Sequence, residues 1–170
     1  NIKESQANKA LVDAVSDMEG VAVFNLYELS QEIAFNIDEW SKIISDASAV
    51  IYQFPFYWMS APSLLKKWQD EVFTFLSKTP AVAGKPLTVV TTTGSEYEAY
   101  RSGGRNRFTT DELLRPYQVS AIHSGMSWQT PIVVYGMGTA DAGKNIAEGA
   151  NLYKQRVEML IGNSNAGNNW

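Results

Sequence analysis

The chain has 170 residues and a formal net charge of −4, from 14 basic and 18 acidic side chains. It has no cysteine and a single histidine, which excludes disulfide scaffolds, Cys/His zinc sites and thiolate-anchored clusters, so we expect no metal. The acidic balance argues against a nucleic-acid surface, and no apolar run reaches the roughly 18 residues that span a bilayer, so we expect a cytoplasmic protein that is not membrane-embedded.

The first half of the chain alternates helical and strand patterns. Apolar residues at helical spacing predict a helix over residues 7–18, and the apolar, β-prone run Val21–Phe24 predicts a strand. Helical spacing returns over residues 36–47. The run 49–54 is apolar except for Gln53 and stops at a proline, which predicts a buried strand in the centre of a sheet.

The second half continues this alternation. We predict a long amphipathic helix over residues 62–76, a β-branched strand over 87–93 and two short helical pieces within 109–125, where a proline interrupts the pattern. A strand over 132–135 and a helix over 146–160 follow. Such alternation predicts a parallel sheet covered by helices on both faces, a three-layer α/β/α domain.

We assign residues 1–162 to this domain and residues 163–170, which are small and polar apart from the final tryptophan, to a C-terminal tail. A parallel α/β domain usually opens with a strand, but no strand pattern precedes the first helix. Either residues ahead of Asn1 supply that strand, or the domain has lost it, which would leave a gap in the sheet.

Ligands of open parallel sheets bind beyond the carboxyl ends of the strands, and two loops there carry suitable residues. At residues 4–8, Ser5 and Asn8 and the backbone N–H groups of a starting helix can hold a phosphate, or can simply cap the helix. At residues 54–59, four aromatic side chains surround a proline. They can wall a flat heteroaromatic ring, or can seal the core.

A third loop follows the strand at 87–93. The strand turns through Gly94, where N–H groups and hydroxyls become accessible, and Tyr100 or Arg105 can stabilise negative charge on a ligand. A glycine-containing loop is, however, often only a turn.

Two other features suggest chemistry that we consider secondary. Residues 138–145 nearly match the phosphate-cradling G-x-x-x-x-G-K-[ST] pattern, but Asn145 replaces the hydroxyl that binds Mg²⁺. A nucleotide phosphohydrolase that uses this segment remains an alternative. The single histidine, His123, lies among apolar residues, and we expect a partly buried structural side chain rather than a general base.

The three loops together resemble those of the NAD(P)H:quinone oxidoreductase family. The most specific part is QFPFYWMSAPSLLKKW at residues 53–68, and TTG at 92–94, GGRNRF at 103–108 and LLRP at 113–116 support it. Ser-x-Ala-Asn at residues 5–8 is similar to the family's flavin-phosphate loop. Members are enzymes of flavodoxin-like fold, and some are ancillary subunits of glutathione-gated potassium efflux systems.

The resemblance implies a homodimeric enzyme that binds FMN, or FAD, and passes a hydride from NAD(P)H to a quinone or a similar flat acceptor by a ping-pong mechanism. It also implies an alternative role, in which the protein associates peripherally with a potassium efflux transporter and regulates it. In either role the same residues would hold the flavin.

The roles that the resemblance implies fall into four groups. The flavin phosphate is assigned to Ser5, Ala7 and Asn8, the ring and ribityl chain to Pro55, Phe56, Tyr57, Trp58 and Met59, the pyrimidine edge to Thr92, Thr93 and Gly94, and catalysis to Tyr100, Gly94 and Ser95, with Tyr100 stabilising the reduced flavin.

The sequence also departs from the family pattern. Ser95 stands where many members have a second glycine, so we expect a backbone less able to adopt positive φ and a crowded nicotinamide face. No histidine follows Tyr100 as a charge partner.

Overall fold

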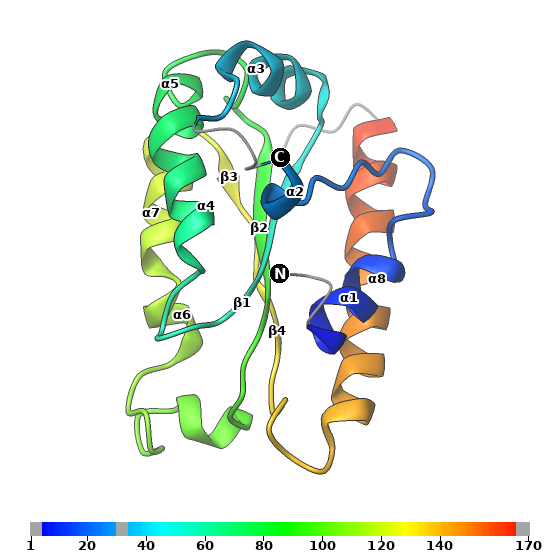
Figure 1. Cartoon of the computed structure of the whole chain (residues 1–170), viewed down its shortest axis with the longest axis vertical. Helices are drawn as coiled ribbons and strands as arrows, with labels where there is room; N and C mark the ends of the chain where they lie inside the picture. Colours follow the sequence, from blue (N-terminus) through cyan, green and yellow to red (C-terminus); the bar gives the residue numbers. More distant parts are fainter. Residues whose placement is uncertain (1–4, 30–33, 166–170) are drawn as a thin grey trace.

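The computed structural model describes residues 5–29 and 34–165 (Figure 1). Within them the sheet has four strands, all paired in parallel: β1 (Val50–Pro55), β2 (Pro86–Thr92), β3 (Ser127–Trp128) and β4 (Ile132–Val134). β2 lies in the middle. β1 pairs with one edge of it along its whole length, and β3 and β4 follow each other along the other edge.

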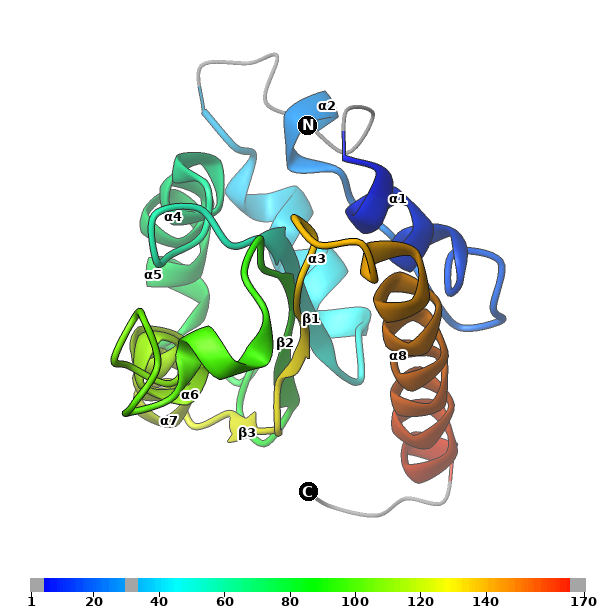
Figure 2. The same ribbon diagram turned by 90° about the horizontal axis from the view of Figure 1, so that it is seen from below.

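Helices cover both faces of the sheet, which confirms the predicted three-layer architecture (Figures 1 and 2). One face carries α1 (Gln6–Asp13) and α8 (Ala142–Asn165). The other carries α4 (Ser63–Trp68), a π-helical turn (Gln69–Phe73), α5 (Thr74–Leu76), α6 (Thr110–Leu113) and α7 (Arg115–His123). The short α2 (Leu26–Leu29) and α3 (Ile37–Asp46) lie between the first and fourth helices in sequence.

Alternation along the strands divides the core into two clusters. Tyr52 and Phe54 of β1 pack with Trp68 on the side of α4. Val90 of β2 packs with Leu11 on the side of α1 and α8. Burying such side chains contributes roughly 1.5 to 3 kcal/mol each, so both helical layers are held mainly by apolar contact.

Most predicted elements are present, with shifted ends. The helix predicted over 36–47 is α3, and its N-cap Asn36 accepts a hydrogen bond from the Glu39 N–H at 3.2 Å. The two helical pieces predicted within 109–125 are α6 and α7. The short β3 and a 3₁₀ turn at Tyr97–Tyr100 were not predicted, because neither is long enough to show a period.

The prediction of a strand at Val21–Phe24 is wrong. The segment has no strand pairing, and the side chains of Val23 and Phe24 are 46% and 41% exposed. Strand propensity gives no stability without a neighbouring strand to complete the ladder.

The outer edge of β1 carries no strand among the described residues, and none of them forms a strand ahead of α1. A cavity of about 660 Å³ borders that edge instead. Residues 20–27, α3, β1, α4 and α8 contribute to its lining. Residues 20–25, which form no strand, thus line this cavity together with β1.

The far end of the chain continues as helix beyond the predicted domain boundary. Residues 163–165, assigned to the tail, form the end of α8, and the rest of that tail lies outside the described residues. Across residues 5–29 and 34–165, no helix combines the length and the apolar character that a bilayer crossing needs.

Candidate functional site at the carboxyl rim of the sheet

The three candidate loops converge at one edge of the sheet. Pro55 at the end of β1 lies opposite Thr92 at the end of β2, which in turn lies opposite Val134 at the end of β4. The amino end of α1 reaches the same edge, because Asn8 bonds to Thr92. We call this edge, at the bottom of Figure 1, the carboxyl rim.

A hydrogen-bonded group of four side chains fixes α1 to the rim, and we call it the Asn8 cluster: Ser5, Asn8, Gln53 and Thr92. The N-cap Ser5 Oγ accepts from the Asn8 N–H at 3.2 Å and from Asn8 Nδ2 at 3.1 Å. Asn8 Nδ2 also donates to Thr92 Oγ1 at 3.0 Å, and Gln53 Nε2 donates to the Asn8 carbonyl at 2.9 Å. Asn8 is 4% exposed, so these bonds are made largely out of water.

This arrangement suits an anion. The first N–H groups of a helix have no partner within the helix, and the helix dipole favours negative charge at that end. The residues predicted to hold a phosphate, Ser5, Ala7 and Asn8, therefore occupy the first turn of a helix whose start is locked to two strands.

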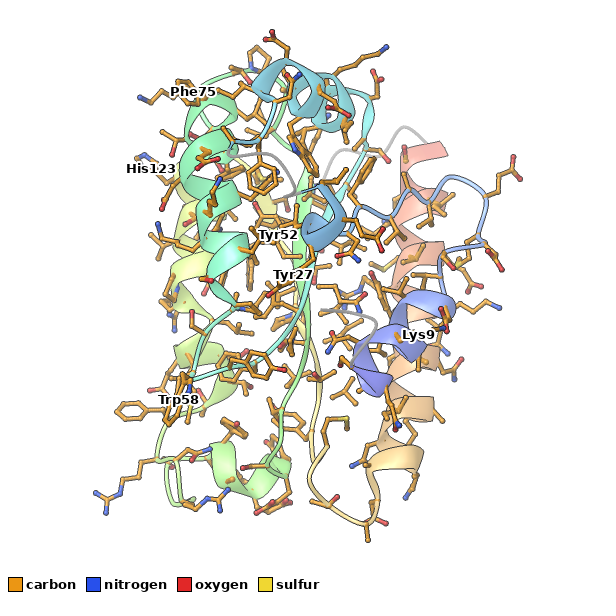
Figure 3. The ribbon with its side chains drawn as sticks, in the orientation of Figure 1. Lys9, Tyr27, Tyr52, Trp58, Phe75 and His123 are labelled. Atoms are coloured by element: carbon orange, nitrogen blue, oxygen red, sulfur yellow. The ribbon has the colours of Figure 1, made fainter. Side chains whose placement is uncertain are left out.

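The aromatic loop after β1 divides between core and surface. Phe56 is buried, and its N–H donates to the Thr92 carbonyl at 2.9 Å. Tyr57 and Ser60 then exchange two backbone hydrogen bonds, which turns the chain. Trp58 and Met59, inside that turn, have φ of 47° and 63°, and the Trp58 side chain is 97% exposed and points away from the body (Figure 3). The core interpretation therefore fits Phe56, and the ligand-wall interpretation fits Tyr57, Trp58 and Met59.

Hydrogen bonds from Thr93 hold the loop after β2 in place. The Thr93 N–H donates to the Val134 carbonyl and its hydroxyl donates to the Ser95 carbonyl, so both groups serve the loop itself. A Cβ at Gly94 would meet nothing within 4 Å, which leaves open space on that side of the loop.

The backbone of Ser95 agrees with the expectation that a serine here avoids positive φ. Ser95 is not among the described residues with positive φ, so the serine needs no glycine-like conformation. Its carbonyl accepts from the Gly136 N–H, and its hydroxyl accepts from the Arg105 guanidinium. Arg105 is thereby tied to the rim.

Tyr100 lies in a cluster of tyrosines. It is 6% exposed, with its ring 6.3 Å from that of Phe56 and 5.8 Å from that of Tyr135. Tyr135 shares a hydrogen bond of 2.7 Å with Thr110 Oγ1, and burial raises the pKa of the Tyr135 hydroxyl. Sequence reasoning missed Tyr135 as a rim residue, although it ends a predicted strand.

Of the two secondary features, the 138–145 segment reaches the rim, where the Gly138 N–H donates to the Gly94 carbonyl at 2.9 Å. His123 is exposed at the end of α7, so its predicted partial burial is wrong; Ala121 and Ser124 take the buried positions there (Figure 3). Lys144 pairs with Glu148 on the exposed surface of α8 at 3.8 Å, and Asn145 Nδ2 donates to the Tyr135 carbonyl. This loop therefore closes the end of β4 and presents no lysine to a phosphate.

Comparison with known proteins agrees with this geometry. A family model described as the flavodoxin-like fold matches residues 2–157. The glutathione-regulated potassium-efflux system ancillary protein KefG of Serratia proteamaculans is 35% identical over 137 residues, which cover 78% of this chain and 75% of that protein.

Two solved structures are also similar. General stress protein 14 of Treponema denticola, in complex with FMN, is 27% identical over 94% of each chain, with a TM-score of 0.85. An NADPH-quinone reductase from P. pentosaceus is 26% identical over 92% of this chain and 91% of that one, with a TM-score of 0.77. With its parallel sheet and its family match over most of its length, this chain belongs to the flavodoxin-like fold family.

Proposed function

We propose that the protein is an FMN-dependent oxidoreductase that carries two electrons from NAD(P)H to a quinone or a similar flat acceptor. The observation that carries the proposal is the locked amino end of α1 beside an open, aromatic carboxyl rim. A relative of the same fold holds FMN, and another is an NADPH-quinone reductase. The net reaction is NAD(P)H + H⁺ + quinone giving NAD(P)⁺ + hydroquinone.

The residues present fit the flavin. The first turn of α1, with Ser5, Ala7 and Asn8, would hold the phosphate, and the turn Pro55–Met59 would line the ring and the ribityl chain. The open space beside Gly94 leaves room for the pyrimidine edge next to the Thr92 and Thr93 backbone. When bound, FMN would supply the two-electron chemistry, accepting a hydride and later giving it up.

Tyr100 would act at the oxygen end of the ring. Its ring is buried and packs between those of Phe56 and Tyr135, which holds the side chain in place. A hydroxyl donor aimed at an oxygen that gains negative charge stabilises the charge without reorganisation. The backbone of Gly94 and Ser95 would line the flavin face at which the nicotinamide binds first and the acceptor binds second.

We also propose that two copies assemble across the rim. Tyr57, Trp58 and Met59 are exposed on one rim loop, and Tyr97 and Phe108 on its neighbour. Exposed aromatic clusters of this kind mark interaction surfaces. Sedimentation of the FMN-loaded protein at micromolar concentration should give a dimer; a monomer at all concentrations would argue against this assembly.

The test of the enzyme is direct. Anaerobic NADPH or NADH added to the purified protein loaded with FMN should bleach the flavin absorbance within seconds, and a quinone should then restore it. Chromatography of the released flavin would distinguish FMN from FAD. A flavin that stays oxidised with both nicotinamides would contradict the proposal, and Mg²⁺-dependent ATP hydrolysis without yellow colour would instead support the phosphohydrolase.

A regulatory role is the second candidate, because KefG is 35% identical to this chain. In that role the protein would associate peripherally with a potassium efflux transporter. Surface variants that retain NADPH oxidation but lose co-purification with such a transporter would favour it. Binding that never exceeds that of an unrelated flavoprotein would count against it.

A further inference from the structure

Gln53 interrupts an otherwise apolar strand sequence, AVIYQF at residues 49–54. It is not one of the residues assigned to the flavin phosphate, yet it bonds to one of them, Asn8. Its neighbours in β1 alternate between the two faces of the sheet: Tyr52 and Phe54 join the cluster on the side of α4, and Ile51 joins the one on the side of α1. Gln53 therefore emerges beneath α1, where a polar group costs free energy unless it is bonded.

The Gln53 amide makes that bond to Asn8. Nε2 lies 2.9 Å from the Asn8 carbonyl oxygen and 3.4 Å from Asn8 Oδ1. A donor facing Oδ1 fixes which way the Asn8 amide points, because Oδ1 must face Gln53 and Nδ2 must face away from it. Nδ2 then donates to Ser5 Oγ and to Thr92 Oγ1.

The consequence falls on Ser5. A hydroxyl oxygen has two acceptor positions and one hydrogen. Ser5 Oγ already accepts from the Asn8 N–H and from Asn8 Nδ2, so its own hydrogen remains to be donated. Ser5 is thus set as a donor at the start of a helix, where a phosphate oxygen is the matching acceptor.

We infer that Gln53 is a positioning residue for the flavin phosphate: through Asn8 it orients Ser5 as a hydrogen-bond donor to that phosphate. This inference rests on the proposed function. It separates Gln53 from residues that merely pack, because its effect must appear in recognition of the phosphate and not of the ring.

The experiment compares FMN with riboflavin, which has the same ring and ribityl chain but no phosphate. Dissociation constants for both are measured from quenching of flavin fluorescence, with wild type and Gln53→Met. We expect Gln53→Met to weaken FMN about 10-fold or more, since a hydrogen bond to a charged group is lost, and to leave riboflavin within about 2-fold. An equal loss for both flavins, or none for FMN, overturns the inference.

A double-mutant cycle tests the route through Ser5. Ser5→Ala alone should weaken FMN and spare riboflavin, and adding Gln53→Met to it should change FMN affinity by less than about 2-fold, because the donor is already gone. Fully additive losses would show that Gln53 acts otherwise.

Gln129→Met is the matched control. Gln129 is also half-buried, and its Nε2 donates to the Ser127 carbonyl and hydroxyl beside the other end of β2. Gln129→Met should leave the affinities for FMN and for riboflavin unchanged.

If Gln53→Met does not fold, Gln53→Asn, whose amide is one methylene too short to reach Asn8, makes the same comparison. Wild-type protein that binds neither flavin refutes the proposed function itself, whereas normal FMN binding with an unchanged FMN to riboflavin ratio in the variants refutes only the inference.

Discussion

Trp58 has a strained backbone and a fully exposed side chain, and neither feature stabilises the protein when nothing is bound to it. Its φ of 47° is in the left-handed region, which costs a non-glycine residue conformational energy, and its side chain is 97% exposed. The adjacent Met59 shares the left-handed backbone. The turn is held by the backbone bonds between Tyr57 and Ser60, so the fold presents this indole to whatever covers the carboxyl rim.

We therefore predict that Trp58→Ala changes the free energy of unfolding by less than about 0.5 kcal/mol, because no buried contact is lost. It should weaken FMN by roughly 5- to 30-fold, since a ligand that covers an indole buries apolar area. Urea unfolding and flavin titration measure the two effects. Phe75→Ala is the control: Phe75 is also exposed but lies on α5, remote from the rim, so FMN affinity should not move (Figure 3). Unchanged FMN affinity in Trp58→Ala would contradict the assignment of this loop.

At the scale of elements, the close packing of α8 on β4 depends on Gly149. A Cβ built there would lie 2.4 Å from Val134 Cγ2, and Val134 is buried on the strand that ends at the rim. Glycine in a helix normally costs roughly 0.5 to 1 kcal/mol relative to alanine. Here that cost is offset because the absence of a side chain lets α8 pack closely against β4.

Gly149→Ala should consequently lower the free energy of unfolding by about 1 to 2 kcal/mol, because overpacking outweighs the gain in helix propensity. Gly162→Ala, in the same helix with nothing within 4 Å of its Cβ, should raise it by up to about 1 kcal/mol. Thermal unfolding of the two variants checks both signs. A stabilised Gly149→Ala protein would show that α8 can move away from β4 at little cost.

The start of α6 carries a charge-dependent cap. Thr109 and Glu112 form a capping box, and the bonds from the Thr109 backbone N–H and hydroxyl to the carboxylate lower the Glu112 pKa below its ordinary 4.5. A lowered pKa in the folded state means that ionisation stabilises folding. This contribution is complete above pH 4.5 and disappears as the pH falls through the lowered pKa.

We predict that Glu112→Gln is less stable than wild type near neutral pH and that the difference shrinks as the pH falls below about 4, because wild type then loses the charge that the variant lacks. Urea unfolding at several pH values measures it. Thr109→Val keeps the backbone donor but lacks the hydroxyl. Its difference from wild type in the free energy of unfolding should therefore change less with pH than the difference measured for Glu112→Gln. A difference that stays constant with pH would show that the carboxylate contributes only its shape.

For the whole molecule, ligand binding and stability are linked. If FMN bridges the start of α1 and the ends of β1 and β2, it binds only the folded chain. FMN at about 100 times its dissociation constant should then add about 2.7 kcal/mol and raise Tm by roughly 5 to 10 °C. Differential scanning fluorimetry with FMN, and with riboflavin at equal concentration, measures this. A Tm that does not change at saturating FMN would contradict binding at this site.

Much of the site follows from sequence, but the roles within it do not. The pattern of residues 54–59 predicts an aromatic loop at a strand end, yet nothing local separates Phe56, which is buried, from Trp58, which is exposed. The turn between Tyr57 and Ser60 makes that division. Thr93, predicted at the pyrimidine edge, uses its hydroxyl and N–H to hold the loop itself.

Periodicity and capping signals are local, because they reflect which face of a helix or strand is apolar within a few residues. They therefore predicted most of the helices and strands, the layered class and the three rim loops from the sequence alone. Tertiary structure decided that Val21–Phe24 is no strand, since a ladder needs a partner, and that Gln53 serves the start of α1. The bonds from Gln53 to Asn8 and from Asn8 to Thr92 join residues 45 and 84 positions apart, and only packing brings such groups within hydrogen-bonding distance.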